Sequence, residues 1–530
     1  MSSVVQRALL VGLLTLPWVW PLTYGPVSGA EPYLVSAMLA AAALVLWPAH
    51  DAAQAVRIAA WSWLAAALLS SVIALLQYFH LETAFYPYIN GATPGLAFGN
   101  LRQPNLLASL LMIGALALYW AARDRPLFWR YPAWPMGALL VIALAATASR
   151  VGLVELLACS ALLTWWAVAS REPGRGWRMA LIVGAALALY VLAALVLPLL
   201  AQSTEGIAGR DMVERLRTAE STCGSRLILW SNVLHLIHLK PWTGWGWGGL
   251  AYAHYITLYD GPRFCHILDN AHNLPLHLAV ELGVPAALLI CALLAWLVWH
   301  GRPWAERQPA RQLAWAVLLA IGIHSLVEYP LWYGPFQIAA AICVWLLWAT
   351  RARRPAPADA ATAAGLPASA RIGPWRYVAA AVMLCAVAYA GWDYVRVSQI
   401  YQPVGQRIAL WRDDPMGNAK KSWLYNGVAR FAEVTSHPAT RANAGWMLPE
   451  ALRMLHFSPE PRVIIRVIES ASFLGRDDLA LAHLARFRAA FPREHRAWME
   501  NNQRMLKDAQ ELLQSDEPAR AASGGSGNGG

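Results

Sequence analysis

Apolar runs of about 17 to 22 residues recur along most of this 530-residue chain, and each is long enough to cross the hydrocarbon core of a bilayer as a helix. Hydrophobic residues make up 58% of the sequence and charged residues 14%, so soluble packing could not cover all of these runs. The sequence therefore predicts an all-α polytopic membrane protein with about eleven transmembrane helices. We place them near residues 7–24, 33–49, 57–78, 104–121, 134–149, 150–169, 179–200, 283–299, 312–328, 333–350 and 377–395.

The loops between alternate spans are rich in arginine, which by the positive-inside rule marks the cytoplasmic side. The intervening loops, among them 79–103 and 201–282, and the tail after residue 395 then face outward. These arginines account for much of the net charge of +11, so the charge does not argue for a nucleic-acid partner. The first apolar run has an alternative interpretation as a signal peptide, because residues 27–30 form an acceptable cleavage site.

The apolar runs and loops divide the chain into five parts. We predict transmembrane helices 1–7 in residues 1–200, a large outward-facing loop in 201–282 where chemistry could take place, helices 8–11 in 283–395, an outward-facing helical domain in 396–515 and a disordered tail in 516–530. Residues 352–370, rich in alanine and proline, form a cytoplasmic linker between the last two spans. In the helical domain, apolar residues recur at helical spacing from 463 to 474, Gly475 ends that helix, and Asp477 can cap the next one. This pattern predicts one helical hairpin of the tetratricopeptide kind.

Two polar stretches lie at outward span ends. Pro104 fits the first turn of a helix, which leaves Arg102, Gln103 and Asn105 near the membrane surface, where an anion could meet the helix start. A simple interfacial helix start is the alternative. Arg150 interrupts a nearly continuous apolar stretch, and an arginine there is costly to desolvate unless it meets an anion or a carboxylate. We favour a bound anion for Arg150, and the alternative partner is Glu155.

The large loop gathers many cationic and imidazole side chains: Arg210, Arg215, Arg217, Arg226, His235, His238, Lys240, Arg263, His266 and His272. His272 lies just before the eighth span, where it could act as a base, with Asp269 and Asn273 as the nearest groups to orient it. A structural histidine at a helix start is the alternative, and we expect loss of His266 or His277 to matter much less. The glycine run 244–249 lacks the Lys-Ser/Thr of a nucleotide-binding loop, so we predict no nucleotide site.

The six cysteines show no paired spacing, which argues against a zinc site or an iron-sulfur cluster. Cys223 and Cys265 share the outward loop, in a compartment where disulfides persist, and we predict that they are bonded. The alternative is two free thiols far apart in space. After the ninth span, residues 324–333 bring a histidine, Glu328 and two phenols to membrane depth, where polar groups are rare and usually functional.

Several of these short motifs occur together in one order: Arg-Gln-Pro-Asn at 102–105, Ser-Arg-x-Gly at 149–152, Ser-Arg at 225–226, His-Asn at 272–273 and His-Ser-Leu-Val-Glu-Tyr-Pro-Leu at 324–331. In this order they resemble the bacterial protein O-oligosaccharyltransferases of the PglL type, within the O-antigen ligase and polymerase superfamily. The resemblance covers roughly residues 1–400. The helical tail also matches the C-terminal region of this branch.

The resemblance implies a metal-independent enzyme without a cofactor, which transfers a preassembled glycan from undecaprenyl pyrophosphate to a hydroxyl of an exported protein such as a pilin. It implies an inner-membrane protein with a periplasmic active site, contacts with membrane lipids and no nucleic-acid partner. The family's histidine falls on His272, its glutamine on Gln103 and its tyrosine on Tyr329, with Tyr333 as the alternative. The other expected site residues are the pyrophosphate ligands Arg102, Arg150, Arg226 and Asn105, and the supporting residues Asn273, Glu328 and Asp269.

Two other functions stay open. Within the superfamily, the chain could be a ligase that places O-antigen on lipid A core, or a polymerase that extends the glycan. A lipid or polysaccharide transporter is the alternative from another class, although we find no nucleotide motif and no evident inverted repeat.

Overall fold

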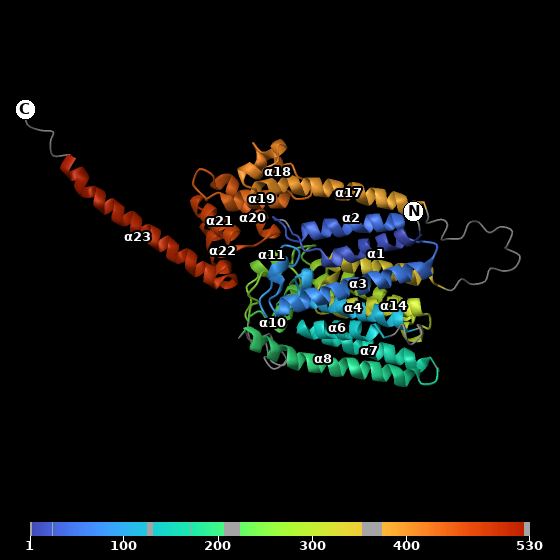
Figure 1. The fold of residues 1–530 in the computed structure, drawn as a ribbon. Coiled ribbons are helices and arrows are strands. Elements are labelled where there is room, and N and C mark those ends of the chain that lie inside the picture. Colours follow the sequence, from blue (N-terminus) through green and yellow to red (C-terminus); the bar gives the residue numbers. More distant parts are fainter. Residues whose placement is uncertain are drawn as a thin grey trace, which may run out of the picture.

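The computed structural model describes residues 3–23, 25–123, 131–170, 172–205, 223–351 and 374–523. Within these ranges every regular element is helical, which confirms the predicted all-α class. The helices lie side by side in one large bundle, with a smaller group of C-terminal helices at one end (Figure 1). The predicted linker at 352–370 and residues 524–530 of the predicted tail lie outside the described residues.

Each predicted span has a helix. These helices are α1 (Ser3–Val19), α2 (Ala30–Leu46), α3 (Ala52–Tyr78), α4 (Pro104–Ala122), α6 (Ala133–Ala146), α7 (Arg150–Ala169), α8 (Arg175–Glu205), α13 (Val284–Gly301), α14 (Pro309–Ser325), α15 (Gly334–Ala349) and α17 (Trp375–Ser398). Among the described residues, six helices are long and apolar enough to cross a membrane, namely α3, α4, α7, α8, α13 and α17. Four others are apolar but shorter, so the count of about eleven spans stays a prediction.

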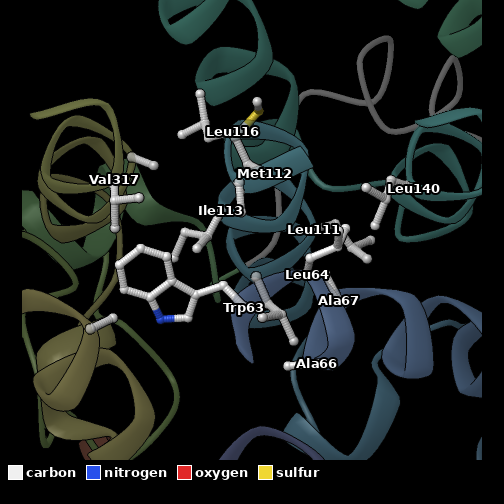
Figure 2. Packing of buried hydrophobic residues seen from close by; sticks show 14 of the residues in the cluster. Trp63, Leu64, Ala66, Ala67, Leu111, Met112, Ile113, Leu116, Leu140 and Val317 are labelled. Carbon is white, nitrogen blue, oxygen red and sulfur yellow. The ribbon is translucent and has the colours of Figure 1, made fainter. Parts of the chain in front are cut away.

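Helix α4 lies at the centre of the bundle, where it packs against α3, α6, α7 and α14. It approaches α3 very closely at Gly114, where an added Cβ atom would lie only 2.2 Å from the Cβ of Ala67. Small residues at such a crossing let two helix backbones pack tightly within a membrane. Trp63 of α3 fills the adjoining space and is 1% exposed, with its ring between α4 and Val317 of α14 (Figure 2). This packing fixes α4 against α14, the two helices that lead to the candidate site.

The described part of the segment between α8 and α13, residues 223–283, folds into three helices at one end of the bundle: α10 (Arg226–Leu239), α11 (Leu250–Ile256) and α12 (Leu274–Leu282). Only Gly283, with φ of 87°, separates α12 from α13. A side chain there would clash, since a Cβ would lie 2.2 Å from the Trp242 carbonyl oxygen. The turn between the two helices therefore requires glycine.

The C-terminal region is also helical and lies at the same end as α10 and α11 (Figure 1). It contains α18 (Pro415–Lys420), α19 (Asn426–Ser436), α20 (Ala444–Phe457), α21 (Pro461–Phe473), α22 (Asp477–Ala490) and α23 (Pro492–Ser523). Short 3-10 turns complete the described elements: η1 (Glu82–Phe85), η2 (Gly99–Leu101), η3 (Pro303–Ala305), η4 (Pro330–Trp332), η6 (Gln399–Tyr401), η7 (Val404–Gln406) and η8 (Ala409–Trp411).

Two details of this region differ from the prediction. Asp477 is the first helical residue of α22 rather than its cap, and the capping position belongs to Arg476 without a side-chain hydrogen bond. Asp477 instead favours the helix through its negative charge in the first turn. Helix α23 continues to Ser523, past residue 515, where we placed the end of the domain.

Candidate active site

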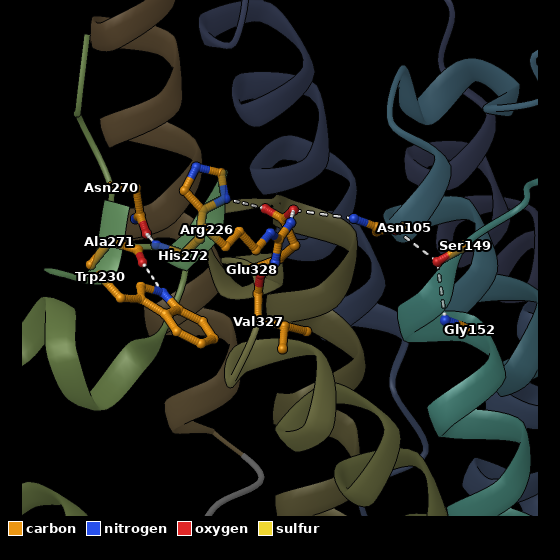
Figure 3. Close-up of polar contacts among 10 residues, drawn as sticks. All are labelled: Asn105, Ser149, Gly152, Arg226, Trp230, Asn270, Ala271, His272, Val327 and Glu328. Carbon is orange, nitrogen blue, oxygen red and sulfur yellow. Dashed lines mark hydrogen bonds and ion pairs between the residues drawn. The ribbon is translucent and has the colours of Figure 1, made fainter. Parts of the chain in front are cut away.

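Glu328 lies in the turn beyond the end of α14, and its side chain is 4% exposed. Three groups contact its carboxylate (Figure 3). His272 Nδ1 lies 2.6 Å from Oε2, Asn105 Nδ2 donates to Oε1 at 3.1 Å, and Arg226 Nη2 also donates to Oε1. These residues come from four separate parts of the chain, and each was a predicted site residue.

The charge of Glu328 is set by opposing effects. Burial raises the pKa of its carboxyl, but the hydrogen bond to His272 and the charge of Arg226 outweigh burial, so the pKa is lower than usual. Glu328 is therefore a carboxylate at neutral pH. A carboxylate that accepts from Nδ1–H fixes the histidine tautomer with Nε2 as the basic nitrogen. The His272 side chain is 26% exposed, so a substrate can reach it.

The backbone at His272 adopts a left-handed conformation, with φ of 48°. Such a conformation is strained for a residue with a side chain, and the surrounding structure must hold it. Buried Asn270 accepts a hydrogen bond from the His272 amide at 2.9 Å. Trp230 of α10 donates to the Ala271 carbonyl at 3.1 Å (Figure 3). These two contacts aim the imidazole at Glu328.

The group that orients His272 differs from the sequence expectation. Asp269 and Asn273 are nearest in the sequence, but Glu328 makes the contact with the imidazole. Asn273 caps α12 and donates to the Leu326 carbonyl at 2.9 Å, which ties the loop to the end of α14. Asp269 is exposed, and its negative charge contributes to a raised pKa of Tyr329. The Asn273 side chain is engaged with the Leu326 carbonyl and the Leu276 amide, so the contact to the imidazole comes from Glu328.

The two Ser-Arg motifs have the same local structure. Ser149 caps α7 by accepting from the Gly152 amide at 3.0 Å, and Ser225 caps α10 by accepting from the Ile228 amide at 3.3 Å. Each following arginine is the first residue of its helix. Arg226 turns inward to Glu328 and to the Val327 carbonyl.

Asn105 and Ser149 connect the starts of α4 and α7 to this carboxylate. The Ser149 hydroxyl donates to Asn105 Oδ1 at 2.7 Å, and Asn105 in turn donates to Glu328. The sequence did not predict this role for Ser149, although it is part of a polar break between two apolar spans. Because polar side chains between two apolar spans are rare, the break itself could have marked Ser149 as a site residue.

The remaining predicted residues lie at or just before the starts of α4 and α7. Arg102 is held by the Pro21 carbonyl at 2.5 Å and by Asn90 Oδ1 at 3.1 Å, rather than by Glu328. Gln103 is the residue before Pro104, which is the first residue of α4 as predicted. Arg150 has an exposed side chain at the first position of α7.

Both candidate tyrosines adjoin the histidine. The Tyr329 ring meets His272 edge to face, with centroids 5.1 Å apart, and the Tyr333 ring stacks against Tyr329 at 6.1 Å. Burial raises the pKa of the Tyr329 phenol, so it stays protonated and can donate a hydrogen bond. Of the two tyrosines, Tyr329 is the one whose ring contacts the imidazole, and Tyr333 packs behind it.

A second polar cluster lies inside the bundle. The Ser109 hydroxyl is 2.5 Å from Glu155 Oε1 and 2.6 Å from His324 Nδ1, and all three side chains are fully buried. Glu155 was considered in the sequence as a partner of Arg150, and the structure instead bonds it to Ser109. The sequence did carry a signal for this cluster, since Ser109, Glu155 and His324 are polar residues within predicted apolar spans, where polar groups are rare and usually functional.

Cys223 and Cys265 are bonded in the structure, with Cα atoms 5.4 Å apart. The bond joins the segment before α10 to the segment that leads to His272. No group of three or more His, Cys, Asp or Glu side chains within the described ranges could hold a metal ion.

Three family models match segments that together contain the cluster around Glu328. A protein glycosylation ligase model matches residues 97–120, an O-antigen ligase model matches 135–291, and a model of the C-terminal part of virulence factor membrane-bound polymerases matches 312–505. Asn105 lies in the first segment, Arg226 and His272 in the second, and Glu328 in the third. These matches confirm the resemblance predicted from the sequence to the O-antigen ligase superfamily and its glycosylation ligases.

One curated relative is a general O-oligosaccharyltransferase of Acinetobacter baylyi. It is 28% identical over 289 residues, which cover 54% of this chain and 49% of the relative. The match thus spans about half the length of that protein.

Proposed function

We propose that this protein transfers a preassembled glycan from undecaprenyl pyrophosphate to serine or threonine hydroxyls of exported proteins. The reaction would take place at the periplasmic face of the bacterial inner membrane. The contact between His272 and Glu328 carries the proposal, because a carboxylate-oriented imidazole is suited to take a proton from a hydroxyl. The resemblance to protein glycosylation ligases and to a general O-oligosaccharyltransferase supports a protein as acceptor.

In the proposed reaction, the acceptor oxygen forms a bond to the anomeric carbon of the first sugar, and the bond from that carbon to the pyrophosphate oxygen breaks. The hydroxyl proton passes to His272 Nε2, while the pyrophosphate keeps the electron pair of the broken bond. Negative charge then grows on the leaving group and needs cationic hydrogen-bond donors. Arg226 is the first candidate, because it contacts the same carboxylate, Glu328, as His272 does. The Arg226 side chain is 35% exposed, so the leaving group can reach it. Arg102 and Arg150 are further candidates at the starts of α4 and α7.

A second candidate function comes from the names of the matching family models. An O-antigen ligase would use the same donor and place the glycan on lipid A core, and a polymerase would place it on another glycan. All three reactions need the same base and the same leaving-group stabilisation, so the site chemistry alone does not separate them.

The test is a reconstitution of the purified protein with an undecaprenyl pyrophosphate-linked glycan and no nucleotide or ion gradient. A pilin-like protein, lipid A core and a lipid-linked glycan are offered as acceptors in parallel. We expect the intact mass of the protein acceptor to increase by the mass of the glycan. Transfer only to lipid A core or only to glycan would replace our proposal by the ligase or the polymerase. Transfer to any acceptor without an energy source would contradict the interpretation as a transporter. Repeating the assay with a metal chelator tests whether the reaction is independent of metal ions.

A further inference from the structure

Two tryptophans form an exposed aromatic surface beside the candidate active site. The rings of Trp247 and Trp332 are nearly parallel, with an angle of 13° between their planes and centroids 6.2 Å apart. Trp247 is 67% exposed and Trp332 is 40% exposed. Large exposed indoles in a fixed arrangement are typical of a surface that binds a partner.

The loop that carries Trp247 is rigidly attached to the junction of α12 and α13. The amides of Trp245 and Gly246 donate to the carbonyls of Val280 and Glu281 at 2.9 and 3.0 Å. At Gly244, with φ of 64°, a Cβ would lie 2.4 Å from the Glu281 carbonyl oxygen. The glycines of this run therefore allow a close approach of two backbones, which holds Trp247 in place.

The aromatic surface continues to the catalytic histidine. The Trp332 ring meets Tyr329 edge to face at 6.3 Å, and Tyr329 meets His272 at 5.1 Å. A small cavity lies beside Trp332 and Tyr329, and Asn270, His277, Ser325 and Glu328 also line it. A group bound on the tryptophans would thus lie next to the site of proton transfer.

His277 gives this cavity a hydrogen-bonding group. Its side chain is 3% exposed, its Nε2 lies 3.5 Å from Glu281 Oε2, and its Nδ1 has no hydrogen-bond partner among the described residues. Burial, together with the nearby His272, lowers the pKa of His277 to about 4, so the ring is neutral. With Nε2–H directed to Glu281, Nδ1 can accept a hydrogen bond from a hydroxyl. A buried polar atom without a partner is costly, which favours a ligand group at this position.

We propose that Trp247, Trp332 and His277 form a subsite for the sugar that is bonded directly to the pyrophosphate of the donor. This inference rests on the proposed function. The indole faces would pack against the apolar C–H face of the sugar ring, and a ring hydroxyl would enter the cavity to meet His277. The sugar's anomeric carbon would then lie close to His272, where the acceptor oxygen must attack. The rival explanation is that both tryptophans only anchor the protein at the membrane interface.

The test compares Trp247→Leu and Trp332→Leu with Trp242→Leu, a matched control in the same outward loop that is 78% exposed. The substrates are synthetic polyprenyl pyrophosphates that carry a single hexose or N-acetylhexosamine. We expect the two test variants to raise the donor KM roughly tenfold, with a smaller change in kcat, while Trp242→Leu stays near wild type. Trp332→Tyr, which keeps an aromatic face, should restore most of the loss. An unchanged donor KM, or an equal effect of Trp242→Leu, would overturn the subsite.

Failure of the subsite and failure of the proposed function give different results. If the wild-type protein transfers glycan and the tryptophan variants match it, the subsite is wrong and the proposed function stands. If the wild-type protein transfers nothing, retention of the same donors on the purified proteins replaces KM as the measurement. Loss of retention in Trp247→Leu and Trp332→Leu, but not in Trp242→Leu, would then support the subsite alone, and equal retention would refute it.

Discussion

Glu328 organises the candidate site at the level of single residues, because one buried carboxylate holds an imidazole, a guanidinium and an amide. The histidine is the group that does chemistry in our proposal, and the other three residues hold it and the leaving group in place. Two predictions separate these roles.

The first prediction concerns His272. A positioned base contributes about a hundredfold to ten-thousandfold to a rate, so His272→Ala should lose that much transfer while it still inserts in the membrane and binds the lipid-linked donor. The control is His266→Ala, because His266 is exposed in the same loop. Initial rates with purified protein give the comparison. Near-normal transfer by His272→Ala, or a loss explained by its absence from the membrane, would remove the catalytic role.

The second prediction concerns Arg226. Its guanidinium contacts Glu328 and the Val327 carbonyl at once, which a lysine ammonium cannot do with the same fixed geometry. We expect Arg226→Lys to weaken the use of limiting donor by roughly tenfold, from the loss of one charged hydrogen bond. Arg102→Lys and Arg150→Lys should have smaller effects, since the described contacts of Arg102 lie away from Glu328. If all three variants keep wild-type turnover, arginine binding of the pyrophosphate is wrong.

At the level of helices, the cluster of Glu155, Ser109 and His324 joins α7, α4 and α14 inside the bundle. The third prediction is that His324→Leu destabilises the protein by about 1–3 kcal/mol, because it removes a buried hydrogen-bond partner of the Ser109 hydroxyl and the imidazole that lies 3.9 Å from Glu155 Oε1. A double Glu155→Leu/His324→Leu variant should recover much of the loss. Thermal unfolding in detergent measures both, with the exposed Val154→Ala as control. A single variant as stable as wild type would show that this cluster does not hold the helices together.

The fourth prediction concerns the bond between Cys223 and Cys265, which closes a loop with a sequence separation of 42. A loop of this length is expected to stabilise the folded state by roughly 3 to 4 kcal/mol, through restriction of the unfolded chain. The double Cys→Ser variant should therefore unfold at a lower temperature and lose transfer, because the bond holds the segments before Arg226 and His272. Peptide mapping without reduction should recover the linked pair. Alkylation of both cysteines before reduction would contradict the bond.

At the level of the whole molecule, the C-terminal helices pack directly on α11, which lies between α10 and α12 in the chain. The buried Tyr255 hydroxyl of α11 lies 2.8 Å from His483 Nδ1 of α22, and Arg486 donates to the Ile256 carbonyl at 2.9 Å. The Tyr252 ring stacks on His456 of α20 at 3.5 Å. The loop that carries His272 is thus supported from both sides, by the bundle and by the C-terminal helices.

The fifth prediction tests this support. Burial lowers the pKa of His483 to about 4, so the neutral ring can accept from the Tyr255 hydroxyl. His483→Ala would leave that hydroxyl buried without a partner, at a cost of about 1–3 kcal/mol. Hydrogen–deuterium exchange in α11 and α22 should then become faster, while His437→Ala, on the exposed end of α19, should change neither helix. Unchanged exchange in His483→Ala would mean that this contact does not hold the two parts together.

The sequence by itself determined the helical class, the position of a helix at each predicted span and the residue types of the candidate site. Apolar runs force helices because the bilayer leaves no other partner for the backbone, and Pro104 and the Ser-Arg motifs mark helix starts through local bonding rules. These signals depend on neighbouring residues alone, so helices and their starts can be predicted from short stretches of the sequence. The sequence motifs also led to the superfamily whose models match the chain.

Only the tertiary structure decided which of these residues meet. The imidazole of His272 is oriented by Glu328, 56 positions away, rather than by its neighbours. Glu155 contacts Ser109 across two helices, although Arg150 is closer in the sequence. Such pairs depend on the rotation and depth at which helices pack, which are set by interdigitating side chains along their whole length. Local sequence therefore predicts the groups, and the packing of the helices selects their partners.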